Sequence, residues 1–211
     1  SMIETRPDWC VSRQRVWGVP LPIFISKKTG DVLVDDEVFE NIAKIYEKEG
    51  SDCWFNEDYQ IFLGDKYKAE DYEKLSDIVE VWFDSGSTHS FVLEKRDDLK
   101  WPASMYLEGS DQHRGWFHSS LLESCGTRGV APFESILSHG FVVDGKGLKM
   151  SKSTGNVIAP QDILKKYGAD ILRIWVASSN YAEDLRIDYS ILDQHAESYR
   201  KIRNTFRYLL G

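Results

Sequence analysis

Short apolar runs that alternate with helical patterns dominate the last two thirds of the chain. The segments 78–83 (IVEVWF), 104–109 (SMYLEG) and 135–142 (SILSHGFV) each read as a strand, and 111–126 and 160–179 carry helical spacing. The nearly continuous apolar run at 78–83 is typical of a strand covered on both faces of a parallel sheet. Strands that alternate with helices predict an α/β fold with a partial doubly wound parallel sheet.

The residues before this region follow a different pattern. The segment 21–34 predicts a short strand and a hairpin, and 36–50 carries apolar residues at helical spacing. These elements favour a small inserted module over 27–77. At the other end of the chain, 188–210 predicts a separate amphipathic helix.

Charge separates the inserted module from the rest of the chain. The 211 residues carry a net charge of −8, and 27–77 hold 15 acidic and 7 basic residues, which accounts for all of it. From Lys146 onward there are 11 basic and 7 acidic residues. A cationic surface there suits phosphates, although on charge alone an ordinary mixed surface is the favoured interpretation.

The number and spacing of the cysteines indicate the redox state of the cellular compartment and whether a zinc site is expected. The three cysteines, Cys10, Cys53 and Cys125, match no zinc spacing, and their odd number argues against a disulfide framework. We therefore expect incidental thiols, a reducing cytoplasmic compartment and no structural zinc. No window approaches eighteen consecutive apolar residues, so no membrane segment is predicted.

Polar clusters stand at the ends of the predicted strands, where doubly wound sheets bind ligands. They are Asp84–Gly86 after the first strand, Glu108–Gln112 after the second and His139–Gly140 within the third. Glycine at such points lets a backbone approach a ligand closely. The carboxylate of Asp111, at the start of a predicted helix, would repel phosphate and suits ribose hydroxyls or an ammonium group.

Two lysines and two tryptophans complete the candidate chemistry. Lys149 and Lys152 lie in the Gly/Ser-rich stretch GLKMSKSTGN, from which they can close over a polyphosphate and neutralise developing charge. A solvated surface loop is the alternative. Trp82 and Trp116 lie near two of the polar clusters, and they either wall an apolar ligand pocket or belong to the core.

Several stretches together resemble a known family of enzymes. KMSKS at Lys149–Ser153 is similar to the signature loop of class I aminoacyl-tRNA synthetases. RQRVWGVPLP (13–22), VWFDSGS (81–87), YLEGSDQHRGWF (106–117) and HGFVVDGKGLKMSKSTGN (139–156) resemble the isoleucyl-tRNA synthetases more closely than the valyl or leucyl ones. The resemblance implies activation of isoleucine by ATP, with Mg²⁺, to the adenylate, followed by transfer to the 3′ end of tRNA.

The resemblance also implies roles for individual residues. Those expected at the adenylate or ATP are Glu108, Gly109, Asp111, Gln112, His139, Gly140 and Lys152. Those expected to act on the ATP phosphates are Lys149 and Lys152, and those expected to line the amino-acid pocket are Trp82 and Trp116. No resident metal is implied.

One feature of the family is missing from the 211 residues. None of the five histidines forms the H-x-G-H motif that the family carries. We therefore expect a fragment that is inactive alone. Its expected segments are a return into the catalytic core (3–26), an acidic connective insertion (27–77), the second half of a split Rossmann-like domain (78–184) and the start of a helical anticodon-binding region (185–211).

Other interpretations stay open on the sequence. The chain is alternatively a non-catalytic fragment with residual nucleotide binding, or the equivalent part of a valyl- or leucyl-tRNA synthetase. A stand-alone nucleotidyltransferase of similar fold would need its own histidine pair, which the sequence does not supply. A sheet cut in half exposes an edge strand, so self-association of the chain is also expected.

Overall fold

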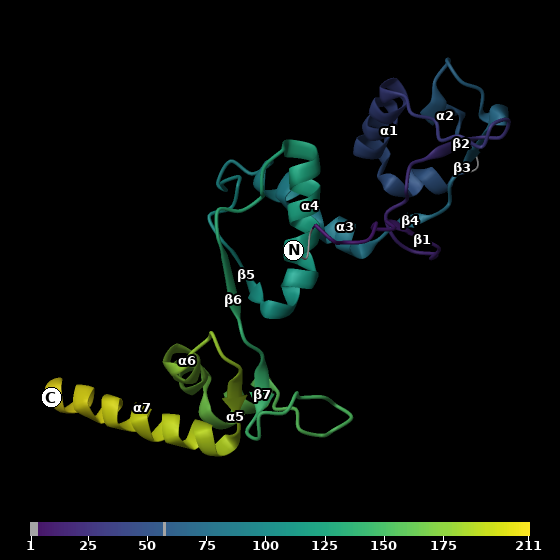
Figure 1. The fold of residues 1–211 in the computed structure, drawn as a ribbon. Coiled ribbons are helices and arrows are strands. Elements are labelled where there is room, and N and C mark those ends of the chain that lie inside the picture. Colours follow the sequence, from purple (N-terminus) through teal and green to yellow (C-terminus); the bar gives the residue numbers. More distant parts are fainter. Residues whose placement is uncertain (1–3, 57) are drawn as a thin grey trace. The chain divides into compact units, whose positions relative to one another are not determined.

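The computed structural model describes residues 4–56 and 58–211 (Figure 1). Within these ranges the chain forms two compact units. The first comprises the described residues up to Pro102 together with Gly115–Pro132, and the second comprises Ala103–Arg114 and Phe133–Gly211. The chain thus leaves the first unit, returns to it for one helix, and ends in the second.

The first unit contains short strands and mostly short helices. They are β1 (Ser12–Arg13), β2 (Phe24–Ser26), α1 (Asp36–Glu49), η1 (Ser51–Phe55), α2 (Gln60–Leu63), η2 (Ala69–Asp71), β3 (Tyr72–Lys74), β4 (Ile78–Val79), α3 (Val81–Gly86), the π-helical turn η3 (His89–Leu93) and α4 (Trp116–Arg128). β1 pairs with β4 and β2 with β3, both antiparallel. The predicted helix over 36–50 is confirmed as α1, which Asp35 caps and Gly50 ends.

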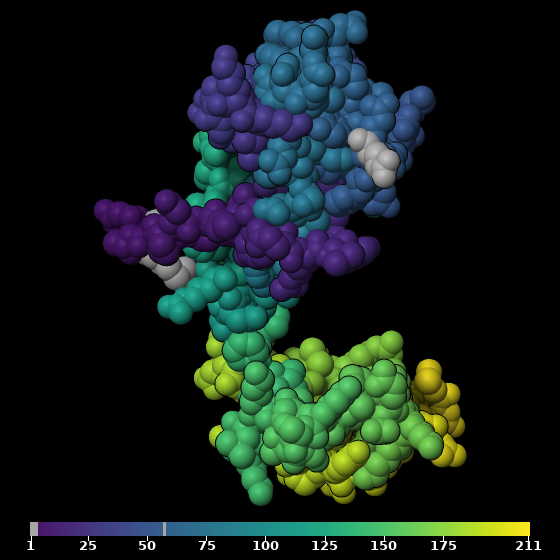
Figure 2. Space-filling model, turned by 90° about the vertical axis from the view of Figure 1, so that its right-hand side faces the viewer, coloured from purple at the N-terminus to yellow at the C-terminus, as the bar shows by residue number. Residues whose placement is uncertain are grey.

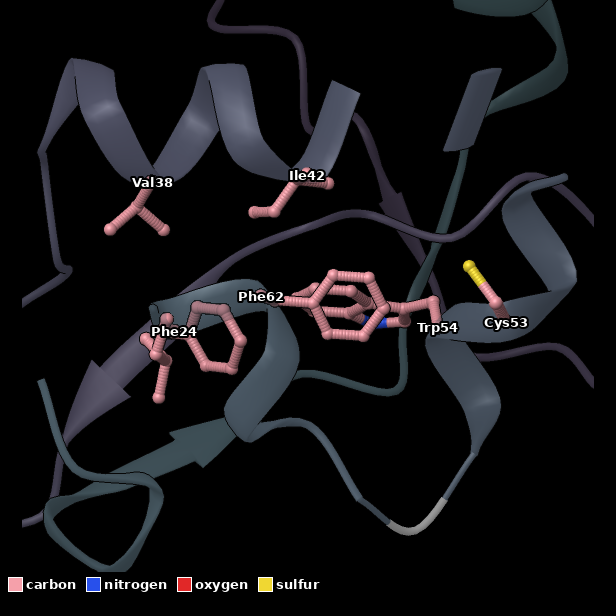
Figure 3. Packing of buried hydrophobic residues seen from close by; sticks show 7 residues of the cluster. Phe24, Val38, Ile42, Cys53, Trp54 and Phe62 are labelled. Carbon is pink, nitrogen blue, oxygen red and sulfur yellow. The ribbon is translucent and has the colours of Figure 1, made fainter. Parts of the chain in front are cut away.

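The stretch from β2 to β3 closes around an apolar core of its own (Figure 3). Its buried members are Phe24, Val38, Ile42, Cys53, Trp54, Phe62 and Leu63. The Trp54 ring lies 5.0 Å from the rings of both Phe24 and Phe62, and its indole N–H donates to the carbonyl oxygen of Leu75 at 2.8 Å. We call the whole range 24–75 the insertion module. The bounds of the four segments that the sequence predicted stay a prediction.

The strand predicted over 78–83 is wrong beyond its second residue. β4 ends at Val79, and helix α3 begins at Val81 because the Glu80 carboxylate accepts a hydrogen bond from the backbone N–H of Trp82 at 3.0 Å. The following apolar side chains are not covered on two faces, since Val81 is 66% exposed and Trp82 42%. An apolar run alone did not distinguish a buried strand from the first turn of a half-exposed helix.

The second unit carries the parallel strand pairs. Its elements are β5 (Tyr106–Gly109), η4 (Ser110–Arg114), β6 (Ile136–His139), β7 (Val142–Asp144), α5 (Pro160–Tyr167), α6 (Ala169–Ser178), β8 (Leu185–Ile187) and α7 (Tyr189–Leu209). β5 pairs with β6 and β7 with β8, both parallel, which confirms the α/β class. In the described residues the strands form four two-stranded sheets instead of one continuous sheet.

Two predicted elements of this region are divided in the structure. The strand expected over 135–142 is two strands, β6 and β7, separated at Gly140. The helix expected over 111–126 is the short 3₁₀ helix η4 followed by α4, with a break at Gly115. In both cases a glycine lies at the break, where the chain changes direction.

The helices of the second unit pack over one apolar cluster. Its buried members are Ile163, Ile171, Trp175, Ile187 and Leu192. The predicted helices α5, with Pro160 in its first turn, α6 and α7 are all confirmed. The C-terminal half of α7 extends away from α5 and α6 (Figure 1), and the part of this unit from Phe133 onward is coloured green to yellow in Figure 2. Within the described ranges no helix is long and apolar enough to cross a membrane.

Candidate functional site

The carboxyl ends of β5 and β6 bring two of the predicted clusters together. The parallel register places Glu108 opposite Ser138 and Gly109 opposite His139. Glu108 is exposed, whereas Gly109 is buried. The edge therefore presents an exposed carboxylate next to a buried glycine at the carboxyl ends of two parallel strands, and ligand binding there stays a prediction.

The helix η4 continues directly from this edge. The Gln112 amide donates to Asp111 Oδ2 at 3.2 Å, and a Cβ placed on Gly109 would lie only 2.6 Å from Asp111 Oδ1. The Asp111 carboxylate therefore folds back over Gly109, and any side chain there would displace it. Asp111 lies inside η4 and does not open a long helix as predicted. His113, which the sequence did not single out, joins η4 to β6 through a 2.8 Å contact between its Nε2 and Ser138 Oγ.

His139 and Gly140 end β6 with a different arrangement. The His139 Nδ1 lies 2.8 Å from the carbonyl oxygen of Gly140, and the Gly140 N–H donates to the Tyr181 carbonyl at 2.9 Å. A Cβ on Gly140 would lie 2.3 Å from the Glu183 carbonyl oxygen. Close packing of the chain against itself thus already favours glycine at this position, and the ligand contact expected from the sequence stays a prediction.

The lysine loop, which we define as Gly147–Asn156, follows β7 in the same unit. Lys149 forms a β-bridge with Val143, and both Lys149 and Lys152 are exposed. Among residues 4–56 and 58–211, neither lysine ammonium has a hydrogen-bond or ion-pair partner. The two positive charges are therefore available to an anionic ligand.

The two tryptophans predicted for an apolar pocket lie in the first unit. Trp82 is in the first turn of α3, and Trp116 opens α4. The Trp116 indole N–H donates to the carbonyl oxygen of Ser85 at 2.9 Å, which ties the start of α4 to α3. Trp116 is thus a packed and hydrogen-bonded residue, and Trp82 is the more exposed of the pair.

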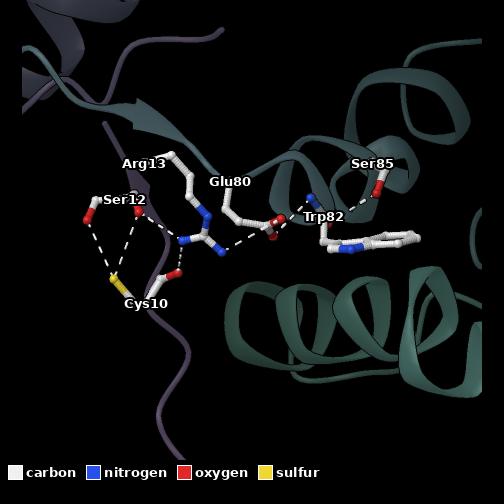
Figure 4. A network of polar contacts seen from close by, with 6 residues as sticks. All are labelled: Cys10, Ser12, Arg13, Glu80, Trp82 and Ser85. Atoms are coloured by element: carbon white, nitrogen blue, oxygen red, sulfur yellow. Dashed lines mark hydrogen bonds and ion pairs between the residues drawn. The ribbon is translucent and has the colours of Figure 1, made fainter. Parts of the chain in front are cut away.

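A polar network that the sequence argument missed fixes the start of α3 (Figure 4). Arg13 donates to the carbonyl oxygens of Cys10 and Ser12 at 2.7 and 2.8 Å, and its guanidinium lies 3.8 Å from the buried carboxylate of Glu80. The other Glu80 oxygen caps the N–H of Trp82. Glutamate is not a favoured N-cap residue, so the sequence offered only a weak signal for this role.

A family model decides the class of protein. The model for tRNA synthetases class I (I, L, M and V) matches residues 1–188. The chain belongs to the class I tRNA synthetases.

Two curated relatives of this synthetase chain are both isoleucine–tRNA ligases. The chain is 88% identical over all 211 residues to the isoleucine–tRNA ligase of Pelagibacter ubique, and it spans 23% of that protein. It is 58% identical over its whole length to the isoleucine–tRNA ligase of Zymomonas mobilis, of which it spans 22%. The chain therefore spans about a quarter of the length of the curated relatives it matches.

A solved structure supports the fold of the synthetase chain. It is LeuRS from Agrobacterium radiobacter, solved as a ternary complex with tRNA and LeuAMS. The match has a TM-score of 0.66 and 18% sequence identity, and it covers 95% of this chain and 28% of that chain. At this identity the likeness establishes the architecture alone.

The synthetase chain also contains two carboxylates with raised pKa values, Asp84 in α3 and Glu123 in α4. Burial is the main cause that raises the pKa of Glu123 to about 8, and the nearby charge of Asp84 is the second cause. Burial and the charge of Glu80 raise the pKa of Asp84 as well. Among the described residues, the buried Glu123 Oε1 has no hydrogen-bond partner, and it occupies the space where a Cβ on Gly86 would lie. A neutral Glu123 is thus favoured near neutral pH.

Metal-ligating side chains do not gather in the described part of the synthetase chain. No group of three or more His, Cys, Asp or Glu residues there is arranged to hold a metal ion. Cys10, Cys53 and Cys125 are all free thiols.

Proposed function

We propose that the chain is the part of an isoleucine–tRNA ligase that binds ATP and the aminoacyl-adenylate. The observation that carries this proposal is the 88% identity, over every residue of the chain, to a curated isoleucine–tRNA ligase. The reaction would join the isoleucine carboxylate to the α-phosphorus of ATP with release of pyrophosphate, and then transfer the isoleucyl group to the 3′ end of tRNA.

The lysine loop is suited to the first step. Negative charge grows on the departing pyrophosphate as the bond to the α-phosphorus breaks. The unpaired ammonium of Lys152, assisted by that of Lys149, would stabilise this charge more strongly in the transition state than in bound ATP. ATP would enter as its Mg²⁺ complex, so the metal belongs to the substrate.

The edge formed by β5, η4 and β6 is suited to the nucleoside and the amino-acid head group. Glu108 would accept a hydrogen bond from the ammonium group of isoleucine, and Asp111, folded over Gly109, would meet the ribose hydroxyls. Gln112 would lie near the aminoacyl group. His139 and Gly140 would flank the adenine.

The remaining assignments concern the side-chain pocket and tRNA. Trp82 and Trp116 would line the pocket for the isoleucine side chain, with Trp116 held by its bond to Ser85. The exposed arginines of α7 give a cationic stripe suited to tRNA phosphates; they are Arg200, Arg203 and Arg207. Free thiols fit action in the reducing cytoplasm.

A segment exchange tests the proposal directly. The matching segment of the Pelagibacter ubique ligase is replaced by this chain, which gives what we call the exchange enzyme, and isoleucine-dependent ATP–pyrophosphate exchange is measured. We expect activity within about threefold of the unmodified ligase, because 88% identity retains the named residues' surroundings.

Two controls make the outcome decisive. The chain on its own is expected to show no exchange, because its sequence lacks the H-x-G-H motif. Replacing the segment by an unrelated linker of equal length should abolish exchange. A folded exchange enzyme that activates no amino acid, or that activates valine or leucine in preference to isoleucine, would refute the proposed function.

A further inference from the structure

One carboxylate closes the turn that leads into the lysine loop. Asp144, the last residue of β7, accepts hydrogen bonds at Oδ1 from the backbone N–H groups of Lys146, at 3.0 Å, and Leu148, at 2.8 Å. Its own main chain also pairs with Leu148 and Gly147. The turn packs closely against Asp188, because a Cβ on Gly145 would lie 2.1 Å from Asp188 Oδ2. Asp144 therefore fixes where the loop begins.

One amide closes the loop itself. The Asn156 Nδ2 donates to Asp144 Oδ2 at 2.8 Å and to the carbonyl oxygen of Lys149 at 3.1 Å. Its Oδ1 accepts from the backbone N–H of Ser151 at 2.9 Å. A single side chain thus holds both sides of Met150 and connects them to the carboxylate that ends β7.

The tip of the loop is small and internally bonded. The Thr154 N–H donates to the Ser151 carbonyl at 3.2 Å, and the Gly155 N–H donates to the Lys152 carbonyl at 3.3 Å. Met150 packs against the apolar cluster of the second unit. Lys152 therefore stands on a turn whose two ends are anchored, one by Asn156 and one by Met150.

The anchoring leaves the loop's charges free. Asp144 binds only neutral donors in this network, and the hydrogen bonds from Asn156 and Leu148 hold the pKa of its carboxyl below the ordinary value, so it is ionised at neutral pH. In the described part of the chain, no carboxylate neutralises the ammonium of Lys149 or Lys152. A network built from backbone groups and one amide can fix a loop without consuming the charges that the loop presents.

We propose that Asp144 and Asn156 are positioning residues that set the orientation of Lys152 for adenylate formation. This proposal rests on the proposed function and adds to it the residues that hold the loop in place. The sequence argument expected a loop that closes over a polyphosphate, whereas the hydrogen bonds describe a preorganised one. Preorganised charge is worth more in a transition state than charge that must first be ordered.

The first test uses the chain itself and the variant Asn156→Asp. The substitution keeps the shape of the side chain but replaces its donor with a second carboxylate facing Asp144. We expect the amide protons of Leu148 and Ser151 to exchange at least about tenfold faster with solvent, while those of α6 stay unchanged. The matched control is Asn204→Asp, on an exposed part of α7 where the Asn204 side chain has no hydrogen bond within the described ranges.

The second test is a double-mutant cycle in the exchange enzyme. Asn156→Asp should lower the rate of adenylate formation by about tenfold or more, with the KM for isoleucine unchanged. In a Lys152→Ala background the same substitution should cost less than about twofold, because its effect passes through Lys152. A purely structural role for Asn156 would give equal losses in both backgrounds.

The outcomes separate the two proposals. An exchange enzyme without isoleucine-dependent activity refutes the proposed function, and amide exchange in the chain still decides whether Asn156 holds the loop. Unchanged rates of amide-proton exchange at Leu148 and Ser151 would overturn the positioning role. Losses that multiply independently in the cycle, or a loss no larger than that of Asn204→Asp, would overturn it as well.

Discussion

The insertion module and the lysine loop are ordered by opposite means. The module closes around seven buried residues, among them Trp54 with 0% of its surface exposed. No residue of the loop is fully buried, Met150 is half-buried, and the shape of the loop comes from hydrogen bonds made by Asp144 and Asn156. One region is held by apolar area and the other by polar geometry.

The contrast matters for function because a core and a binding site make different demands. Apolar burial is strong and tolerant of small displacements, so it suits a region with no reacting group. Hydrogen bonds fix distances and directions, and they leave lysine charges unpaired at a surface. We therefore expect mutations in the module to change stability and mutations in the loop to change chemistry.

The largest expected effect breaks the module. Trp54→Ala removes a fully buried indole that packs on Phe24 and Phe62, and it should lower the free energy of unfolding by about 4 kcal/mol. Urea denaturation of the chain measures this. Phe55→Ala, in the same 3₁₀ helix but at a side chain that is largely exposed, is the control and should cost far less. Equal losses in the two variants would contradict the assignment of the core.

The next effect belongs to the loop and leaves stability alone. Lys152→Ala should slow adenylate formation in the exchange enzyme by roughly a hundredfold, equivalent to about 3 kcal/mol, because the lost charge acts on the departing pyrophosphate. Isoleucine binding and the melting temperature should barely change. Pre-steady-state kinetics measures the rate of adenylate formation, and Lys165→Ala, at an exposed lysine of α5, is the control. Equal rates in the two variants would show that Lys152 is an ordinary surface lysine.

A smaller effect tests whether packing alone explains Gly140. Gly140→Ala places a methyl group 2.3 Å from the Glu183 carbonyl oxygen, so the main chain must shift, at a cost of about 2 kcal/mol. Thermal melting of the chain measures it. Gly126→Ala, where an added Cβ meets no atom within 4 Å, is the matched control and should be neutral or slightly stabilising. A neutral Gly140→Ala would show that packing does not require the glycine.

The last expected effect is a pH dependence of stability. The pKa of Glu123 is raised from the ordinary 4.5 to about 8 in the folded chain. Its contribution to stability is therefore fully present below about pH 4.5 and is lost as the pH rises through 8. The melting temperature should fall between pH 6 and pH 9, and Glu123→Gln should reduce that fall. Glu47→Gln, at an exposed position of α1, should leave it unchanged.

The sequence predicted most of the helices because their periodicity and boundary residues agree. The helix 36–50, the pair of helices over 160–179 and the helix 188–210 all have polar caps or a glycine or proline at an end, and all are confirmed. The parallel pairing of β5 with β6 was also predictable from strands separated by a helix. The strand prediction for 78–83 was wrong beyond Val79 because Glu80 caps a helix there, which its apolar neighbours did not indicate.

The candidate site was predictable in residue types but not in its supports. Motifs singled out Glu108, Asp111 and Lys152, and these roles stay proposals. Nothing in the spacing indicated that Asn156 would bond to Asp144 twelve residues away, or that Arg13 would meet Glu80. Such pairs depend on the path of the chain, which periodicity does not report.

The central claim is that this chain supports the activation of isoleucine. A single turnover of the exchange enzyme with equal concentrations of isoleucine, valine and leucine, followed by identification of the enzyme-bound adenylate by mass spectrometry, tests it most directly. The account predicts isoleucyl-adenylate as the dominant product, formed roughly a hundredfold more slowly by Lys152→Ala. No adenylate, or valyl- or leucyl-adenylate as the main product, would contradict it.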